Sequence, residues 1–375
     1  MLRFLHSSDL HLGKPFGRFP EDVRARLRQA RAEALARLAQ LARAQGASHI
    51  LLAGDTFDQM TPAPRVIRQA LNTMAQAEDL QWLILPGNHD HAGASELWRQ
   101  MVQDAPANVT ALLAPRPHGL GDGAVVLPAP PSERAPGRDL TDWFDSAETG
   151  GALRIGLAHG SVADFEGSGG AGGSSVIAPD RAARAGLDYL ALGDWHGMRE
   201  INARTRYSGT PEADSFRHAA RPGALLVEIA GPGAPPQVRA LDSGAIRWQR
   251  LELVLEPQDD PVAAHAACLP PLAERETCLF DLRLRGQLRP AARTELDRAI
   301  AAAAPDFLWH DADASELALL HDSADLDLID RQGALRAAAD ALAAEAADPA
   351  LPSEDRAAAA DALERLFAFA LESET

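Results

Sequence analysis

The feature that most constrains the fold of this chain is a repeated pattern in which a short apolar run ends in a turn bearing Gly, Asp or His. Five such runs are predicted to be strands. They cover residues 3–7, 49–53, 82–85, 154–158 and 188–192. Helical patterns lie between them, most clearly over residues 20–45, where Leu27, Ala34 and Leu38 recur at helical spacing. This alternation predicts an α/β fold in which helices cover a central sheet.

Residues with metal-binding side chains follow each of these predicted strands. In open α/β sheets, ligands gather outside the carboxyl ends of the strands, so we expect these side chains to converge. Carboxylate, amide and imidazole donors together suit Mn²⁺, Fe²⁺ or Zn²⁺ better than a metal that prefers thiolates. The residues are Asp9, His11, Asp55, Asn88, His89, Asp90, His159, Asp194 and His196.

The individual motifs differ in how specifically they indicate a metal site. A lone Asp-x-His, as in 9–11, or a lone Gly-Asp, as in 54–55, is common at turns and helix caps. The tetrapeptide Gly-Asn-His-Asp at 87–90 is much rarer, because neither a turn nor a core requires it. Five pieces in order, each after a predicted strand, indicate a site for two metal ions.

Together these motifs resemble a known signature. Asp-x-His, Gly-Asp-x-x-Asp, Gly-Asn-His-Asp, a later His and Gly-x-x-His are similar to the calcineurin-like metallophosphoesterase signature, over residues 4 to about 212. Residues 6–13 and 207–212 make the chain most similar to SbcD/YhaO-type DNA repair exonuclease subunits. The resemblance implies a metallophosphoesterase β-sandwich core flanked by helices, a small α+β capping domain and a C-terminal helical segment.

The resemblance also implies a role for each motif residue. The ligands of the first metal would be Asp9, His11 and His196. The ligands of the second metal would be Asn88 and His159, with Asp55 bridging both ions. His89 would stand beside the scissile phosphate as a catalytic residue, oriented by Asp90.

One position departs from the family pattern. Where the family usually has His-x-His, this chain has Asp194-Trp195-His196. If Asp194 binds the second metal, its carboxylate adds a harder donor and favours Mn²⁺ or Mg²⁺ over Zn²⁺. In the alternative, Asp194 turns away and water completes the ligand shell; we favour ligation.

The function that the resemblance implies is a Mn²⁺-dependent DNA exonuclease or endonuclease subunit, which hydrolyses phosphodiester bonds with two divalent metal ions. It would act in DNA repair with an SMC-like, SbcC-type ATPase partner. The subunit would be cytoplasmic and associated with the nucleoid, and the resemblance is compatible with a homodimer. Mg²⁺, Fe²⁺ and Zn²⁺ stay open as alternatives to Mn²⁺. The alternative function is a small-substrate phosphodiesterase or phosphoprotein phosphatase of the same superfamily, which would use the same two-metal chemistry. A scaffold with a decayed site is disfavoured, because Asn88, His89 and Asp90 are all present.

Three parts of the chain are expected to form separate domains. Residues 1–242 would form the nuclease domain, and a cluster of Gly and Pro at 231–236 precedes a β-α-β-α-β pattern that we assign to a capping domain at 243–315. In the remaining segment, 316–375, two helical faces are separated by Pro349 and Pro352. A helix pair of this size cannot bury both faces alone, so it should dock the ATPase or pack on the body.

Charge is distributed unevenly along the chain. Residues 1–250 hold 26 basic and 27 acidic residues, whereas 251–375 hold 10 and 26, so nearly all of the net charge of -17 lies in the last third. The acidity therefore restricts where DNA can lie but does not exclude it. Only two cysteines are present, which excludes a disulfide scaffold, and no long apolar run indicates a membrane span.

Basic side chains near the first motif are candidates for substrate binding. Lys14 and Arg18 follow His11 closely and are predicted to contact phosphates. A stripe of Arg24, Arg28 and Arg31 on the first helix is expected to be solvated surface, with a phosphate-binding role as the alternative. The Gly- and Ser-rich stretch 167–175 lacks the ending of a phosphate-binding loop, and we expect it to be a flexible loop.

Overall fold

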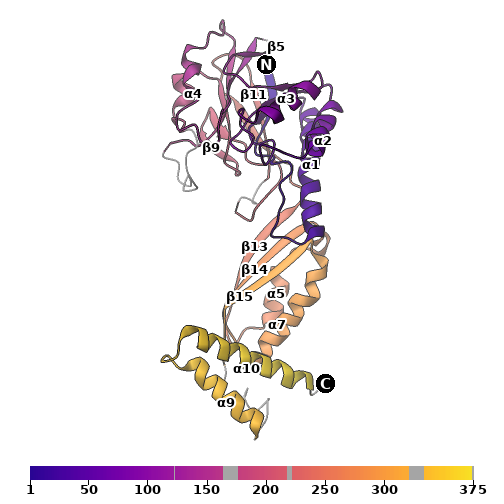
Figure 1. The fold of residues 1–375 in the computed structure, drawn as a ribbon, viewed down its shortest axis with the longest axis vertical. Helices are drawn as coiled ribbons and strands as arrows, with labels where there is room; N and C mark the ends of the chain where they lie inside the picture. Colours follow the sequence, from indigo (N-terminus) through magenta and orange to yellow (C-terminus); the bar gives the residue numbers. More distant parts are fainter. Residues whose placement is uncertain (122, 164–175, 218–221, 321–332, 374–375) are drawn as a thin grey trace. The chain divides into compact units, whose positions relative to one another are not determined.

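The computed structural model describes residues 1–121, 123–163, 176–217, 222–320 and 333–373. The chain divides into two compact units, Met1–Arg247 and Trp248–Thr375 (Figure 1). All residues of the expected metal site lie in the first unit.

The first unit contains two six-stranded sheets, of which the first has the order β12-β11-β1-β2-β3-β4. Its strands are β1 (Leu2–Ser7), β2 (His49–Ala53), β3 (Gln81–Leu85), β4 (Val109–Ala111), β11 (Gly223–Ile229) and β12 (Gln237–Asp242). β1, β2, β3 and β4 run parallel to one another, and β11 joins β1 in the antiparallel direction. The carboxyl ends of the parallel strands therefore share one edge.

The second sheet has the order β5-β6-β7-β8-β10-β9. Its strands are β5 (His118–Gly121), β6 (Ala124–Ala129), β7 (Leu153–His159), β8 (Tyr189–Gly193), β9 (Arg199–Asn202) and β10 (Thr205–Tyr207). β6, β7, β8 and β10 are parallel, so their carboxyl ends also meet at one edge.

Helices cover the outer face of each sheet. Figure 1 shows α1, α2 and α3 on one side of this unit and α4 on the other. The helices are α1 (Glu21–Ala44), α2 (Pro64–Ala75), α3 (Ser95–Asp104), the 3₁₀ turn η1 (Asp142–Ser146) and α4 (Arg181–Arg184). In α1, Leu27, Ala34 and Leu38 are buried, as their helical spacing predicts, and Gly46 follows the helix with a φ of 64°.

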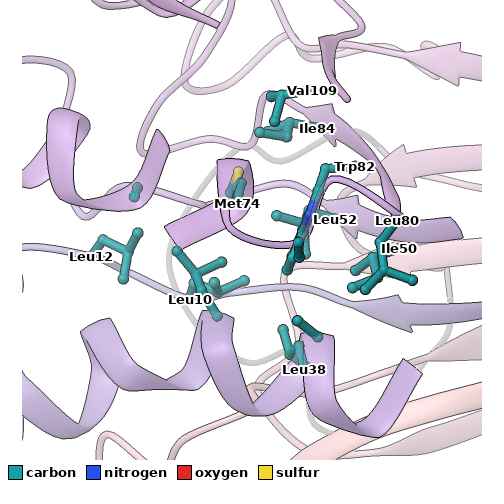
Figure 2. Close-up of a cluster of buried hydrophobic side chains, with 14 of the residues drawn as sticks. Leu10, Leu12, Leu38, Ile50, Leu52, Met74, Leu80, Trp82, Ile84 and Val109 are labelled. Atoms are coloured by element: carbon teal, nitrogen blue, oxygen red, sulfur yellow. The ribbon is translucent and has the colours of Figure 1, made fainter. Parts of the chain in front are cut away.

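The alternation of side chains along β2 shows how both faces of the first sheet are buried. Leu51 and Ala53 lie in the apolar cluster between the two sheets, whereas Ile50 and Leu52 pack under the helices. Figure 2 shows this second cluster, where Leu52 and Trp82 lie close to Met74 of α2 and Leu38 of α1. A strand that is buried on both faces has few polar positions, which is why these strands are continuous apolar runs.

The predicted fold class is confirmed: the chain is a mixed α/β protein with two large sheets flanked by helices. The five expected strands correspond to β1, β2, β3, β7 and β8, with ends that agree or differ by one residue. Strands β4, β5 and β6 were not expected, because they are short or interrupted by Gly and Pro.

The second unit begins with a three-stranded sheet of order β13-β14-β15. Its elements are β13 (Arg247–Leu255), α5 (Pro261–Cys268), α6 (Leu272–Arg275), β14 (Cys278–Leu288), α7 (Pro290–Ala303), η2 (Ala304–Asp306) and β15 (Trp309–Leu319). An apolar cluster that includes Phe280, Leu282 and Leu296 fixes α7 on the sheet. β15 continues to Leu319, beyond the expected boundary at 315. The three-domain division stays a prediction.

Two further helices follow, α9 (Ala334–Ala347) and α10 (Ser353–Ser373). Ala339 and Leu363 are buried between them, with Leu342 and Leu366 packed alongside. Leu335 remains 46% exposed, so part of the apolar face of α9 is uncovered among the described residues. None of the described helices has the length and hydropathy needed to cross a membrane.

Candidate metal centre

The carboxyl ends of the strands from both sheets meet at one place. His6 at the end of β1 donates from Nε2 to the carbonyl of Leu192 in β8, 3.1 Å away, because its Nδ1 accepts from the Tyr189 hydroxyl. Just beyond these strands, the amide of Asp194 donates to a carboxylate oxygen of Asp9 at 3.2 Å. The two strand edges are thus joined, and the residues that follow each strand face a common space.

Asp9, His11 and His196 form a first group of donors, whose ligand atoms all lie within 4.8 Å of one another. The Nε2 atoms of the two histidines are 3.2 Å apart, and His196 Nε2 is 3.9 Å from Asp9 Oδ1. Asp9 is fully buried and His11 nearly so.

The other nitrogen of each of these rings faces a carboxylate. His11 Nδ1 is 3.2 Å from Asp58 Oδ1, and His196 Nδ1 is 3.0 Å from Asp214 Oδ2. A carboxylate at Nδ1 favours the tautomer that carries its proton there, which leaves a lone pair on each Nε2. With the two Nε2 atoms 3.2 Å apart, these lone pairs repel each other. A cation between them would turn this repulsion into attraction, and the donor set therefore fits a divalent metal.

His159, Asn88 and Asp194 form a second group. His159 donates from Nδ1 to the carbonyl of Ala53 at 2.8 Å, and its Nε2 lies 3.8 Å from Asp194 Oδ1. The Asn88 amide nitrogen donates to Asp194 Oδ1 at 3.1 Å. Asn88 Oδ1 is buried and accepts no hydrogen bond from any described residue. A buried acceptor of this kind needs a partner, which a metal ion would supply.

Asp55 lies between the two groups. Its Oδ2 is 3.6 Å from Nε2 of His11 and 3.6 Å from Nε2 of His159. Its Oδ1 accepts from the backbone amide of His89 at 2.9 Å, which fixes the orientation of the carboxylate. One oxygen in reach of both groups is the arrangement expected of a bridging ligand.

The pKa values in the site reflect several buried carboxylates that lie close to one another. Burial, together with the neighbouring charges of Asp9 and Asp194, raises the pKa of Asp55 to about 6, although His159 opposes this. Burial lowers the pKa of His159, but Asp55, Asp9 and Asp194 outweigh it and raise that pKa to about 9. A divalent cation would relieve the repulsion that these carboxylates exert on one another.

The backbone is strained at four of the proposed metal ligands. Asp9, His11, Asp55 and Asp194 have φ values of 55°, 44°, 53° and 102°, and Phe16 is the only other described non-glycine residue with positive φ. Such conformations cost free energy and persist where the surrounding structure enforces them, commonly at functional sites.

His89 and Asp90 lie beside the donors but contact different partners from those expected. The Asp90 carboxylate accepts from the backbone amides of Phe57 and Gly87 rather than from the ring of His89. That ring instead donates from Nδ1 to the carbonyl of Asp58 at 2.8 Å. Asp90 therefore ties together the loops after β2 and β3, and Asp58 orients His89.

One of the three arginines expected on the surface of the first helix also differs from expectation. Arg31 is buried rather than solvated, and its guanidinium donates to the carbonyls of Leu10, Asp9 and Glu212 at 2.7–2.9 Å. It can contact no phosphate, because these loops enclose it. Arg24 and Arg28 both pair with Glu21 on the surface.

Lys14 and Arg18 remain candidates for substrate contact. Lys14 pairs with Asp214 at 2.5 Å, and the Arg18 guanidinium lies 4.6 Å from the ring centre of Phe19 and 5.4 Å from that of Phe216. The stretch 167–175 lies outside the described residues.

Sequence reasoning missed two carboxylates that position ligands, Asp58 and Asp214. Asp58 was visible as the last residue of Gly-Asp-x-x-Asp at 54–58. Asp214 follows no motif, and only the fold brings it to His196, since 18 residues separate them along the chain.

Comparisons with known proteins found one matching family and several similar proteins. The profile of a family described as Calcineurin-like phosphoesterase matches residues 2–198. The uncharacterized metallophosphoesterase YhaO of Bacillus subtilis is 26% identical over 258 residues, which cover 61% of this chain and 57% of YhaO. The SbcD subunit of the nuclease SbcCD from Rhodobacter capsulatus is 27% identical over 288 residues, or 63% of this chain and 69% of that protein.

A third relative matches a shorter region. The DNA double-strand break repair protein Mre11 of Archaeoglobus fulgidus is 32% identical over 91 residues, which cover 24% of this chain and 19% of that protein. The alignment with YhaO likewise spans little more than half of that relative's length.

The close approach of Gly54 to His159 gives a first prediction. Gly54 has a φ of +93°, and a Cβ there would lie 2.1 Å from His159 Nδ1. We expect Gly54→Ala to displace His159 and weaken Mn²⁺ binding about 10–100-fold, as loss of a ligand's support does. Titration of the purified protein with Mn²⁺ measures this. Gly186→Ala is the control, because Gly186 also has positive φ (+58°) but no atom near its Cβ; equal affinity losses in both variants would contradict the explanation.

A second prediction concerns Asp194, whose Oδ1 lies near both Asn88 and His159. If this carboxylate binds the second metal, Asp194→Ala should lower the number of Mn²⁺ ions bound per chain from two to one. Asp104→Ala, which removes an exposed carboxylate at the end of α3, should leave that number unchanged. Full occupancy in Asp194→Ala would show that water completes the shell instead.

Proposed function

Because the chain belongs to the calcineurin-like phosphoesterase family, we propose that it is a Mn²⁺-dependent DNA nuclease subunit that hydrolyses phosphodiester bonds. The observation that carries the proposal is the position of Asp55, one of whose carboxylate oxygens lies 3.6 Å from a histidine of each donor group. Two relatives whose names refer to a nuclease and to DNA double-strand break repair support DNA as the substrate.

The ligands would be divided between the two metal ions. Asp9, His11 and His196 would hold one ion, Asn88, His159 and Asp194 the other, and Asp55 would contact both. When bound, such ions lower the pKa of a coordinated water and neutralise charge on the phosphate. The Asp194 carboxylate makes the second group more anionic and harder than a histidine would, which favours Mn²⁺ or Mg²⁺.

His89 would move the proton of the reaction. Its Nδ1 is occupied by the Asp58 carbonyl at 2.8 Å, so Nε2 is the atom through which the protonated ring can donate. A donor held beside the scissile phosphate can protonate the departing sugar oxygen as the bond breaks. The T-shaped contact with His11, at 4.8 Å between ring centres, keeps the His89 ring beside the metal donors.

The second unit would provide the partner contact. We propose that α9 and α10 dock an SMC-like ATPase, because they bury little apolar surface between themselves and leave Leu335 exposed. Binding to such a partner would supply DNA affinity that the acidic last third of this chain lacks. A subunit with this role would act in the cytoplasm, at the nucleoid.

The nuclease proposal predicts a loss of DNA cleavage in His89→Ala. With Mn²⁺ and linear DNA, the rate should fall about 10²–10⁴-fold, the usual contribution of a positioned proton donor. His118→Ala, in β5 and outside the site, should cleave at the wild-type rate. Wild-type activity on cyclic nucleotides or bis(p-nitrophenyl) phosphate but not on DNA would instead identify a small-substrate phosphodiesterase.

The partner proposal is tested separately by removing α9 and α10. Co-expressed with an SMC-like ATPase of the same genome, the full chain should co-purify with it, and a chain that ends at residue 332 should not. The shortened chain should keep its Mn²⁺ binding, because all proposed ligands lie in the first unit. Co-purification that survives the deletion would rule out these helices as the docking site.

A further inference from the structure

A hollow of about 550 Å³ begins one residue beyond His196, at Gly197. It opens where β9 and β10 of the second sheet approach β11 and β12 of the first, and each of these strands contributes to its lining. The carbonyl of His196 accepts from the amide of Thr210 at 3.0 Å. This hydrogen bond fixes the loop that carries His196 against the loop after β10. The hollow is therefore lined, within the same unit, by the residue that directly follows a proposed metal ligand.

Positive charge predominates around this hollow. Three arginines line it, Arg199, Arg206 and Arg217, against one carboxylate, Glu200. Arg206 pairs with Glu200 at 2.7 Å. Arg217 is exposed, and no ion pair or hydrogen bond joins it to another described residue. Among the lining residues, arginines thus outnumber carboxylates by two, and this composition would attract an anion.

The floor of the hollow is apolar. It is lined by Met198, Leu225, Val238 and Ala240, which belong to the edge of the cluster between the two sheets. An apolar floor below a few charged groups is typical of sites for small organic ligands, and the volume is within their usual range.

A hollow in the second unit provides a comparison. On the sheet of that unit, about 210 Å³ is lined by Arg250, Arg283 and Arg285. Arg250 pairs with Asp281 at 2.7 Å, Arg283 pairs with Asp313, and Arg285 pairs with Glu316 at 2.9 Å. Because a carboxylate neutralises each of these three arginines, we do not expect that face to attract a phosphate.

We propose that the hollow beside His196 binds one nucleotide of a DNA strand, next to the nucleotide whose phosphodiester is cleaved. Arg217 contacts its phosphate, and the apolar floor packs against its base. Recognition of a phosphate together with a base distinguishes a nucleic-acid strand from a small ester that reaches only the metals. The inference rests on the proposed nuclease function and extends it to the path of the strand.

The test measures binding of fluorescein-labelled oligothymidylate to the full chain with Mn²⁺, in a His89→Ala background so that the strand is not consumed. Adding Arg217→Glu should weaken binding about tenfold, the value of one charge-assisted contact. The slope of log affinity against log salt should fall by about 0.7, as for the loss of one phosphate contact on a single strand. Arg68→Glu, which reverses an exposed charge on α2 away from the hollow, should change neither quantity.

The outcomes separate this inference from the nuclease proposal. Unchanged oligothymidylate binding by Arg217→Glu, or an equal loss in Arg68→Glu, would overturn the nucleotide site while wild-type DNA cleavage still supports a nuclease. A wild-type protein that hydrolyses small esters but neither binds nor cleaves DNA would overturn both. Thermal melting of each variant checks that the exposed substitutions leave the fold intact.

Discussion

The constraint that dominates this structure is the repulsion among buried carboxylates at the edge shared by its two sheets, which must be offset for the site to form. Asp9 and Asp55 are almost completely removed from water. The backbone amide of Asp194 donates to Asp9, and the Asp194 carboxylate lies 3.8 Å from Nε2 of His159, which also faces Asp55. Burying charges of one sign is costly unless a counter-charge is present. The histidines supply part of it, and their donor atoms that face the same space are suited to divalent ions, which would supply the rest.

A second set of contacts keeps these groups together. The fully buried Arg31 of α1 donates to the carbonyls of Asp9 and Glu212, so it joins the loop after β1 to the loop after β10. Asp214, in the latter loop, faces His196, and Asp58 faces His11. The first helix thus contributes to the site through one side chain that never reaches the substrate. This explains how loops with left-handed residues can hold their conformation.

Much of the fold and the site could be predicted from the sequence, because the relevant signals are local. Each strand that carries a ligand is a continuous apolar run followed by its motif, so β1, β2, β3, β7 and β8 and the residues after them were identifiable. Arg31 could not be placed in the same way: helical spacing puts it beside the apolar stripe, but only the fold brings loops about 180 residues away over it. The family resemblance implied that Asp90 orients His89, but in this fold the Asp90 carboxylate accepts from the backbone amides of Phe57 and Gly87 instead.

The central claim is that the donors at this edge hold two divalent ions that share Asp55. Anomalous diffraction from crystals of the full chain grown with Mn²⁺ tests it most directly. We expect two manganese peaks, one among Asp9, His11 and His196 and one among Asn88, His159 and Asp194, with the Asp55 carboxylate between them. A single peak, or peaks away from Asp55, would contradict it.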